Sequence, residues 1–324
     1  MQSPDSGLSI HKASTELIPL VVIVGPTAVG KTEISIRLAE RLGAEIISAD
    51  SRLFYLGMDI GTAKPSLAER ERVPHHLVDV TTPDQAWSLA MFQSEANRII
   101  SEIHQRGRLP FLVGGTGQYI QAVTEAWDIP KVEANFSLRN ALENWAAEIG
   151  ALGLHARLAA IDPQAANHID PTNVRRTIRA LEVIFSTGKL FSAQRQRSAS
   201  IHNLLRLGLT RPRTELYSRI DARIEAMLTA GLVEEVGGLL AQGYSPDLPA
   251  LSAIGYRQIV AFLHGQISLV EAVLQIKRQT RVFVRRQANW FKETDPDITW
   301  FQVDDRTMAA MADRIAQWRR KNAR

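Results

Sequence analysis

The stretch Val21–Thr32, VVIVGPTAVGKT, decides the fold class of this chain. Its apolar run ends at Gly25, and Gly25-x4-Gly30-Lys31-Thr32 then matches the phosphate-loop pattern. Glycines allow backbone N–H groups to point inward, and a helix that begins near Gly30 adds the positive end of its dipole. The stretch therefore predicts a strand, a phosphate-binding loop and a helix, and it leaves open which molecule carries the phosphate.

Strands and helices alternate around this stretch. Apolar runs predict strands at residues 20–24, 45–48, 109–113, 204–209 and 298–303. Amphipathic periodicity predicts helices at residues 30–42, 87–105, 118–127, 214–229, 232–241, 269–292 and a last one that ends near 321. Because such alternation gives right-handed crossovers and a parallel sheet, we predict an α/β fold, a P-loop core with a parallel sheet flanked by helices.

Residues 130–200 lack any strand signal. They read as helices broken at Gly150, Gly153, Asp162-Pro163 and Asp170-Pro171. We predict an all-helical insertion domain at residues 130–200, within a catalytic core of residues 18–129 and 201–324. The polar residues 1–17 are expected to form a disordered extension. The alternative is one continuous mixed domain.

Composition narrows the class of protein. The 324 residues carry a net charge of +4 and include no cysteine, which excludes disulfides, thiolate catalysis and cysteine-bound zinc. No apolar run approaches the roughly 20 residues of a membrane helix, so we expect no membrane contact and a cytoplasmic location. Arginine dominates the 38 basic residues, which favours phosphate-rich partners, although a GC-rich genome would give the same bias.

Asp50 follows a predicted strand, in the segment SADSRLFY of residues 48–55. In a parallel sheet this position lies at the carboxyl edge, beside the phosphate loop. Asp50 could order a metal ion, act as a general base or cap the next turn. Asp59 and Lys64 could form a plain turn pair. The strand at 109–113 ends in Gly-Gly-Thr116-Gly instead of an aspartate, which weakens an ordinary NTPase interpretation.

Basic residues form several groups. Lys31 suits a terminal phosphate, and the Thr32 hydroxyl suits a Mg²⁺ ion. Arg219 and Arg223 lie four residues apart on one helix face and could grip a diphosphate or pair with Asp221 or Glu225. Two further segments could bind RNA or be solvated helix faces; they hold Arg175, Arg176 and Arg179, and Arg281, Arg285 and Arg286 among aromatic residues. The histidines lack zinc spacing.

Taken together, these residues resemble one family, tRNA dimethylallyltransferase, also called tRNA isopentenyltransferase. The likeness extends from about Val21 to Lys292. It rests on GPTAVGKT, SADSRLFYLGMDIGTAKP, PHHLVD, VGGTGQYI, RRTIRALEV, TGK, GLVEEV, AIGYRQ and TRVFVRRQANWF, which occur in this order.

The resemblance implies transfer of a dimethylallyl group from dimethylallyl diphosphate to N6 of the adenosine 3′ of the anticodon. It implies an enzyme with Mg²⁺, with tRNA (the anticodon stem-loop) and dimethylallyl diphosphate as partners. We expect a monomer, although the sequence does not give the oligomeric state. Asp50, Thr32, Arg219 and Arg223 would be catalytic. The diphosphate would contact Gly25, Pro26, Thr27, Ala28, Val29, Gly30, Lys31 and Thr32. The tRNA would contact Asp50, Ser51, Arg52, Leu53, Thr116, Arg139, Arg175, Arg176, Thr177, Ile178 and Arg179.

Leu53 departs from the family, which commonly has glutamine at this position to read the target base. A leucine side chain cannot form that hydrogen bond, so base recognition at this position is open. Two other enzyme classes share the phosphate loop: adenylate isopentenyltransferases, which act on free AMP, ADP or ATP, and P-loop nucleotide kinases. A non-catalytic RNA-binding module is a further alternative. The predicted insertion favours tRNA, because a free nucleotide needs no clamp for an RNA stem.

Overall fold

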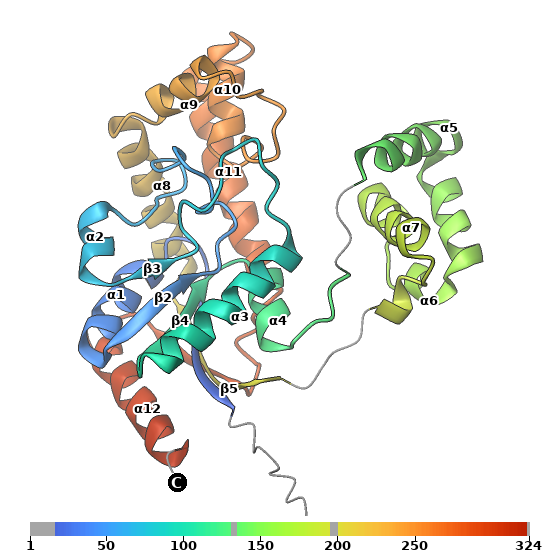
Figure 1. Cartoon of the computed structure of the whole chain (residues 1–324). Helices are drawn as coiled ribbons and strands as arrows, with labels where there is room; N and C mark the ends of the chain where they lie inside the picture. The colour runs from blue at the N-terminus through green and yellow to red at the C-terminus, as the bar shows by residue number, and fades with distance from the viewer. Residues whose placement is uncertain (1–16, 131–134, 195–199, 323–324) are drawn as a thin grey trace, which may run out of the picture.

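The computed structural model of the chain describes residues 17–130, 135–194 and 200–322. All but one residue of the predicted extension at 1–17 lies outside these ranges. The centre of the fold is a six-stranded parallel sheet with the order β3-β2-β4-β1-β5-β6 (Figure 1). The strands are β1 (Ile18–Val24), β2 (Ala44–Ser48), β3 (His75–His76), β4 (Leu109–Gly114), β5 (His202–Thr210) and β6 (Ile298–Gln302). The predicted α/β fold with a parallel sheet is confirmed.

Helices cover both faces of the sheet and form a separate group between β4 and β5 (Figure 1). Those before β5 are α1 (Lys31–Leu42), α2 (Leu67–Arg72), α3 (Leu89–Gln105), α4 (Gly117–Thr124), α5 (Phe136–Ile161), α6 (Pro163–Ala166), α7 (Val174–Thr187) and the 3₁₀ turn η1 (Ser192–Gln194). Those after it are α8 (Arg213–Thr229), α9 (Leu232–Ala241), α10 (Tyr256–Leu263), α11 (Leu269–Gln287) and α12 (Thr307–Asn322).

The strand β1 lies inside the sheet and is buried on both faces. Val21 and Ile23 pack in a hydrophobic cluster with residues of α1 and of α8 to α12. Leu20, Val22 and Val24 point the other way and pack in a second cluster with residues of α3 and α4. Since side chains of a strand alternate between faces, both faces need apolar residues, which explains the unbroken apolar run before the phosphate loop.

The helices α5, α6 and α7 build a hydrophobic cluster of their own, and Figure 1 shows them set to one side of the sheet. Gly150 interrupts α5 with a φ of 75°, and Asp162 accepts the N–H of Ala165 at the start of α6. Gly153 stays inside α5, so the predicted break there is wrong. The domain boundaries at 130 and 200 remain predictions.

The observed elements differ from the predicted ones in two respects. The helix predicted at 269–292 ends at Gln287, because residues 287–290 turn onto the β4–α4 loop, where a Cβ atom at Gly117 would lie 2.2 Å from the Trp290 ring. The helix α10 was not predicted, and neither were the short elements α2 and β3. No helix in the described part of the chain is long and apolar enough to cross a membrane.

Candidate active site

The phosphate loop joins β1 to α1, and Lys31 binds its backbone. The Lys31 Nζ atom donates to the carbonyl oxygens of Gly25 at 2.8 Å and of Pro26 at 2.9 Å. Burial lowers the pKa of Lys31 to about 8; the charge of Asp50 opposes this effect and that of Arg223 adds to it. Lys31 therefore lies within electrostatic reach of both of these side chains, as the sequence predicts for a shared site.

Two arginines bind the next carbonyl groups of the loop. The Arg219 Nε atom donates to the Ala28 oxygen at 2.8 Å, and the Arg211 Nε atom donates to the Val29 oxygen at 2.9 Å. Ala28 has a φ of 66°, a left-handed conformation that costs an L-residue free energy unless neighbours hold it. The exposed Arg219 thus orders the loop from outside, a contact that its predicted role did not include.

Asp50 follows β2 and begins a turn. Its Oδ1 atom accepts the backbone N–H of Arg52 at 3.0 Å, and the Arg52 guanidinium reaches across to the Pro249 carbonyl at 2.9 Å. Burial lowers the pKa of the Arg223 guanidinium, while the charge of Asp50 raises it. Asp50 therefore lies within electrostatic reach of two cations, Lys31 and Arg223, at the carboxyl edge of the sheet.

A cavity of about 290 Å³ brings predicted site residues from separate segments together. The predicted residues among its lining are Thr27, Asp50, Ser51, Arg52, Thr116 and Arg223. Apolar side chains that sequence reasoning missed complete it: Ile220, Ile224, Met227, Leu232, Ile254, Ile276 and Phe283. Ile220, Ile224 and Met227 lie on the same helix as Arg223 and follow one another at i, i+4 and i+7, which places them on one helix face. That helical spacing is the signal that could have identified them.

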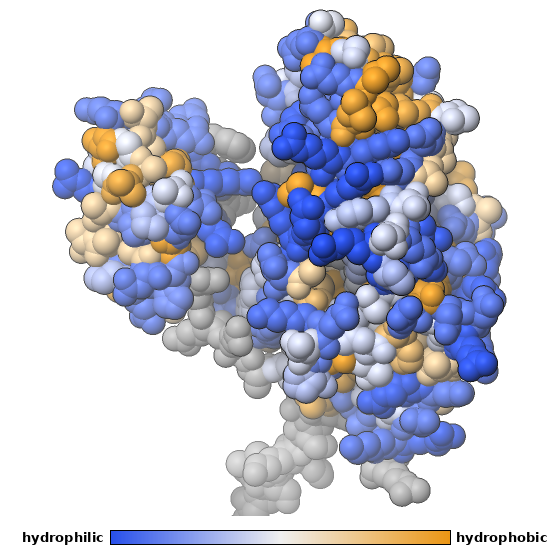
Figure 2. All heavy atoms as spheres, turned by 180° about the vertical axis from the view of Figure 1, so that it is seen from behind, coloured by the Kyte–Doolittle hydropathy of each residue, from blue (hydrophilic) through white to orange (hydrophobic). Residues whose placement is uncertain are grey.

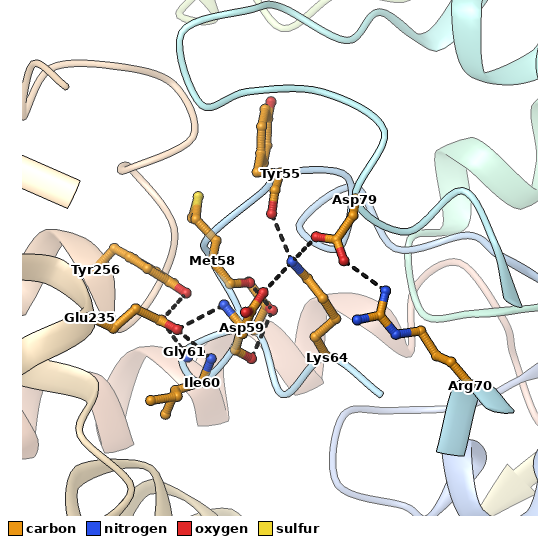
Figure 3. Close-up of polar contacts among 11 residues, drawn as sticks. Tyr55, Met58, Asp59, Ile60, Gly61, Lys64, Arg70, Asp79, Glu235 and Tyr256 are labelled. Carbon is orange, nitrogen blue, oxygen red and sulfur yellow. Dashed lines mark hydrogen bonds and ion pairs between the residues drawn. The ribbon is translucent and has the colours of Figure 1, made fainter. Parts of the chain in front are cut away.

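The segment after Tyr55 also lines the cavity, and Glu235 of α9 fixes it. Its carboxylate accepts the N–H groups of Asp59 at 2.8 Å, Ile60 at 2.7 Å and Gly61 at 3.1 Å, as Figure 3 shows. The Tyr256 hydroxyl donates to the same carboxylate at 2.6 Å. The adjacent residue, Thr62, accepts a hydrogen bond from Arg223 at 3.3 Å through its carbonyl oxygen.

Lys64 closes this segment from the other side. Its Nζ atom donates to the Tyr55 carbonyl at 2.8 Å and forms ion pairs with Asp59 and Asp79. Asp79 also binds Arg70 at 2.7 Å, so the four charged side chains form one network (Figure 3). The Lys64 side chain is only 2% exposed. The pair of Asp59 and Lys64 is therefore more than the plain turn pair that the sequence allowed.

Comparison with known proteins places most of the chain in the family that its sequence motifs resemble. A sequence model of the IPP transferase family matches residues 53–294, and one described as isopentenyl transferase matches residues 18–80. The chain belongs to the IPP transferase family. The tRNA dimethylallyltransferase of Roseiflexus sp. is 52% identical over 303 residues, which cover 93% of this chain and 99% of that protein. That of Thermomicrobium roseum is 51% identical over 285 residues, 88% and 86% of the two chains.

Solved structures of other IPP transferases have the same fold. The tRNA isopentenylpyrophosphate transferase of Bacillus halodurans is 42% identical, with a TM-score of 0.71 over 94% of this chain and 98% of that one. A eukaryotic dimethylallyltransferase acting on tRNA is 27% identical, with a TM-score of 0.76 over 92% and 80% of the two chains.

In this IPP transferase four of the predicted tRNA-binding residues line a second cavity, of about 560 Å³, between α5 and α7: Arg139, Arg175, Ile178 and Arg179. Arg139 donates to both carboxylate oxygens of the buried Glu182, at 2.8 and 3.1 Å, and Arg179 donates to one of them at 2.7 Å. Glu182 holds both guanidinium groups in place, and its pKa is lowered by these arginines against the opposing effect of burial. Thr177 and Ile178 are buried, whereas Arg175 and Arg176 are exposed.

The basic face of α11 is divided between two environments. Arg281 pairs with Asp221 of α8 and lies over the ring of Tyr217, 5.2 Å from its centre. Arg285 and Arg286 are exposed. Figure 2 shows mostly hydrophilic side chains over the larger part of the molecule, apart from a hydrophobic patch near its top, and a mixture of hydrophilic and hydrophobic side chains over α5–α7. Of the predicted RNA-binding residues of α11, Arg285 and Arg286 are therefore available to an external partner, whereas Arg281 is paired within the protein.

The residues at the phosphate loop fit a divalent cation that shares its coordination with a diphosphate. The Thr32 hydroxyl stands at the start of α1, and Asp50 is the only carboxylate among the residues that line the first cavity. Within residues 17–130, 135–194 and 200–322 no group of three histidine, aspartate or glutamate side chains could hold a metal ion. Few protein ligands, completed by phosphate oxygens and waters, are typical of magnesium sites.

Proposed function

We propose that this IPP transferase moves the dimethylallyl group of dimethylallyl diphosphate to N6 of the adenosine 3′ of the anticodon in tRNA. The products are N6-isopentenyladenosine and diphosphate. The observation that carries the proposal is the lining of the first cavity, where Thr27, Asp50 and Arg223 meet a set of apolar side chains. A prenyl diphosphate has one highly charged end and one apolar end, and this lining complements both.

The roles of the polar residues follow from the charges of the reaction. The N6 atom attacks C1 of the dimethylallyl group, the bond from C1 to the diphosphate oxygen breaks, and the diphosphate leaves with the bonding electrons. Asp50 accepts the N6 proton as general base. Lys31, Arg223 and the N–H groups of the phosphate loop stabilise the negative charge that develops on the diphosphate.

Mg²⁺ would be held by the Thr32 hydroxyl together with the diphosphate, and it would neutralise part of the charge on the leaving group. Arg219 supports this region indirectly, since it fixes the Ala28 carbonyl of the loop. We therefore propose that Arg219 contributes to catalysis by ordering the loop that binds the diphosphate.

Acceptor recognition rests on the arginines outside the first cavity. Arg139, Arg175, Arg176 and Arg179 of the insertion and Arg285 and Arg286 of α11 supply cations for the RNA backbone. Ser51, Arg52 and Thr116 line the first cavity, where an unstacked adenine would bind. The relatives named tRNA dimethylallyltransferase support this acceptor over a free nucleotide.

Labelled dimethylallyl diphosphate tests the proposal. The protein is incubated with it and with an anticodon stem-loop, AMP, or a stem-loop that carries guanosine in place of the target adenosine. We expect label in the adenosine stem-loop alone. Transfer to AMP and not to RNA would support the adenylate isopentenyltransferase alternative. Turnover of ATP without prenyl transfer would support a kinase.

A further inference from the structure

Gln287 links two loops that come from different strands of the sheet. It is the last residue of α11 and is only 6% exposed. Its Oε1 atom accepts the N–H of Thr27 at 2.9 Å, and its Nε2 atom donates to the Gly115 carbonyl at 3.1 Å. The reversed amide would place its NH₂ group against an N–H and its oxygen against a carbonyl, so the two partners fix its orientation. One buried amide thus joins the phosphate loop to the turn of Thr116.

The backbone of that turn is shaped to receive the amide. A Cβ atom at residue 115 would lie 2.3 Å from the Gln287 Nε2 atom, which excludes any side chain there without displacement of the amide. A Cβ atom at Gly117 would meet Trp290 in the same way. The segment from Gln287 to Trp290 therefore packs directly on the loop between β4 and α4.

The two loops face one cavity. Thr27 and Thr116 both line it, whereas Gln287 does not reach its surface and so lies behind them. Under the proposed function, Thr27 belongs to the part that holds the diphosphate and Thr116 to the part that receives the adenine. The separation of these two loops sets the distance between C1 of the donor and N6 of the acceptor.

We propose that Gln287 is a positioning residue that holds the donor loop and the acceptor loop in register for prenyl transfer. This inference rests on the proposed function. Because Gln287 contacts neither substrate, its loss should leave the binding of each substrate nearly intact. It should lower the rate of transfer, since a displacement of about 1 Å between reacting groups can cost on the order of 100-fold in rate.

The first test replaces Gln287 by methionine, which retains the side-chain length and removes both hydrogen bonds. We expect kcat to fall at least tenfold in Gln287→Met. We expect the dissociation constants of dimethylallyl diphosphate and of the stem-loop to change less than about threefold. Gln275→Met is the matched control, since Gln275 lies earlier on α11 and its side chain donates to Glu271 of the same helix at 3.4 Å. A kcat for Gln287→Met within twofold of the control overturns the proposal.

The second test uses Gln287→Glu and decides the matter if the methionine variant does not fold. An ionised glutamate accepts from Thr27 but repels the Gly115 carbonyl, whereas a protonated one also donates, as the amide does. At pH 7.5 a glutamate near its usual pKa of about 4.3 is ionised, so the variant should keep the contact with Thr27 and lose the one with Gly115. We expect its kcat to fall at least tenfold, with dissociation constants for both substrates within about threefold of wild type. A kcat within twofold of wild type overturns the proposal. Wild-type protein assayed in parallel separates the two inferences, because absence of its transfer to the stem-loop would refute the proposed function itself.

Discussion

Lys31 and Gly25 are joined by a hydrogen bond of 2.8 Å from the ammonium group to the backbone carbonyl. The lysine that is expected to meet the diphosphate therefore also braces the loop that surrounds it. Its environment is buried enough to bring its pKa to about 8. A group that titrates this close to neutral pH makes the charge of the donor site dependent on pH.

The affinity for dimethylallyl diphosphate should fall as the pH rises above about 8. Below this value Lys31 carries its proton and attracts the diphosphate; above it, the neutral amine does not. Titration calorimetry between pH 7 and 9.5 should show the dissociation constant rising by up to tenfold per pH unit above the pKa. Lys31→Arg is the control, because arginine stays protonated throughout this range. An affinity that is flat with pH in the wild type would contradict this expectation.

Replacement of Asp50 by asparagine should abolish prenyl transfer and preserve the local turn. The asparagine oxygen can still accept the N–H of Arg52, which Asp50 accepts at 3.0 Å, but it cannot take a proton from N6. We expect kcat to fall by roughly 100- to 10,000-fold, the usual contribution of a general base. Binding of the stem-loop, measured by fluorescence anisotropy, should remain within several-fold. A parallel loss of RNA binding would show that Asp50 acts mainly in recognition.

Arg176→Ala should weaken tRNA binding and reduce its dependence on salt. Arg176 is exposed near the start of α7, and an arginine that neutralises one phosphate contributes about one unit to the salt slope. Stem-loop affinity measured from 50 to 200 mM salt should show this smaller slope, with the Michaelis constant for dimethylallyl diphosphate unchanged. Arg41→Ala, at the far end of α1 from the phosphate loop, is the control. An unaltered slope would mean that this part of α7 does not contact RNA.

Lys64→Met should destabilise the protein by about 2 kcal/mol, since Asp59 loses its partner and the partly buried Asp79 keeps only Arg70. The expected result is a lower urea midpoint without a change in the slope of the transition. Arg70→Met should cost less than about 1 kcal/mol, because the Arg70 side chain is 27% exposed and Lys64 stays paired with Asp79. Equal losses of stability in the two variants would show that the burial of Lys64 does not increase its contribution to the free energy of unfolding.

Local sequence patterns were sufficient for most of the sheet and for the phosphate loop. The apolar run of β1 and the amphipathic pattern of α1 are strong. Asp50 follows a strand of a parallel sheet, so it lies at the carboxyl edge of that sheet. The contacts of Lys64 with Asp79 and of Glu235 with Asp59 could not be read in this way. Glu235 lies far along the chain from the backbone that it binds, and no periodic pattern records such a pairing.

The end of α11 illustrates the same limit. Helical periodicity continues to residue 292, yet the helix ends at Gln287. The reason is tertiary: Gln287 bonds Thr27 and Gly115, and Trp290 packs against Gly117. The apolar lining of the first cavity also depends on packing between α8, α9 and α11, although its positions around Arg223 follow helical spacing.

Among the residues that the structure describes, the hydrophobic cluster of α5–α7 shares no member with the two clusters that flank the sheet. Heating should therefore melt residues 136–187 without dismantling the sheet, and calorimetry should resolve two transitions instead of one. An anticodon stem-loop that grips both parts would stabilise each of them and draw the two transitions together. The spacing of the two melting peaks, with and without RNA, thus becomes a direct measure of whether tRNA spans the molecule.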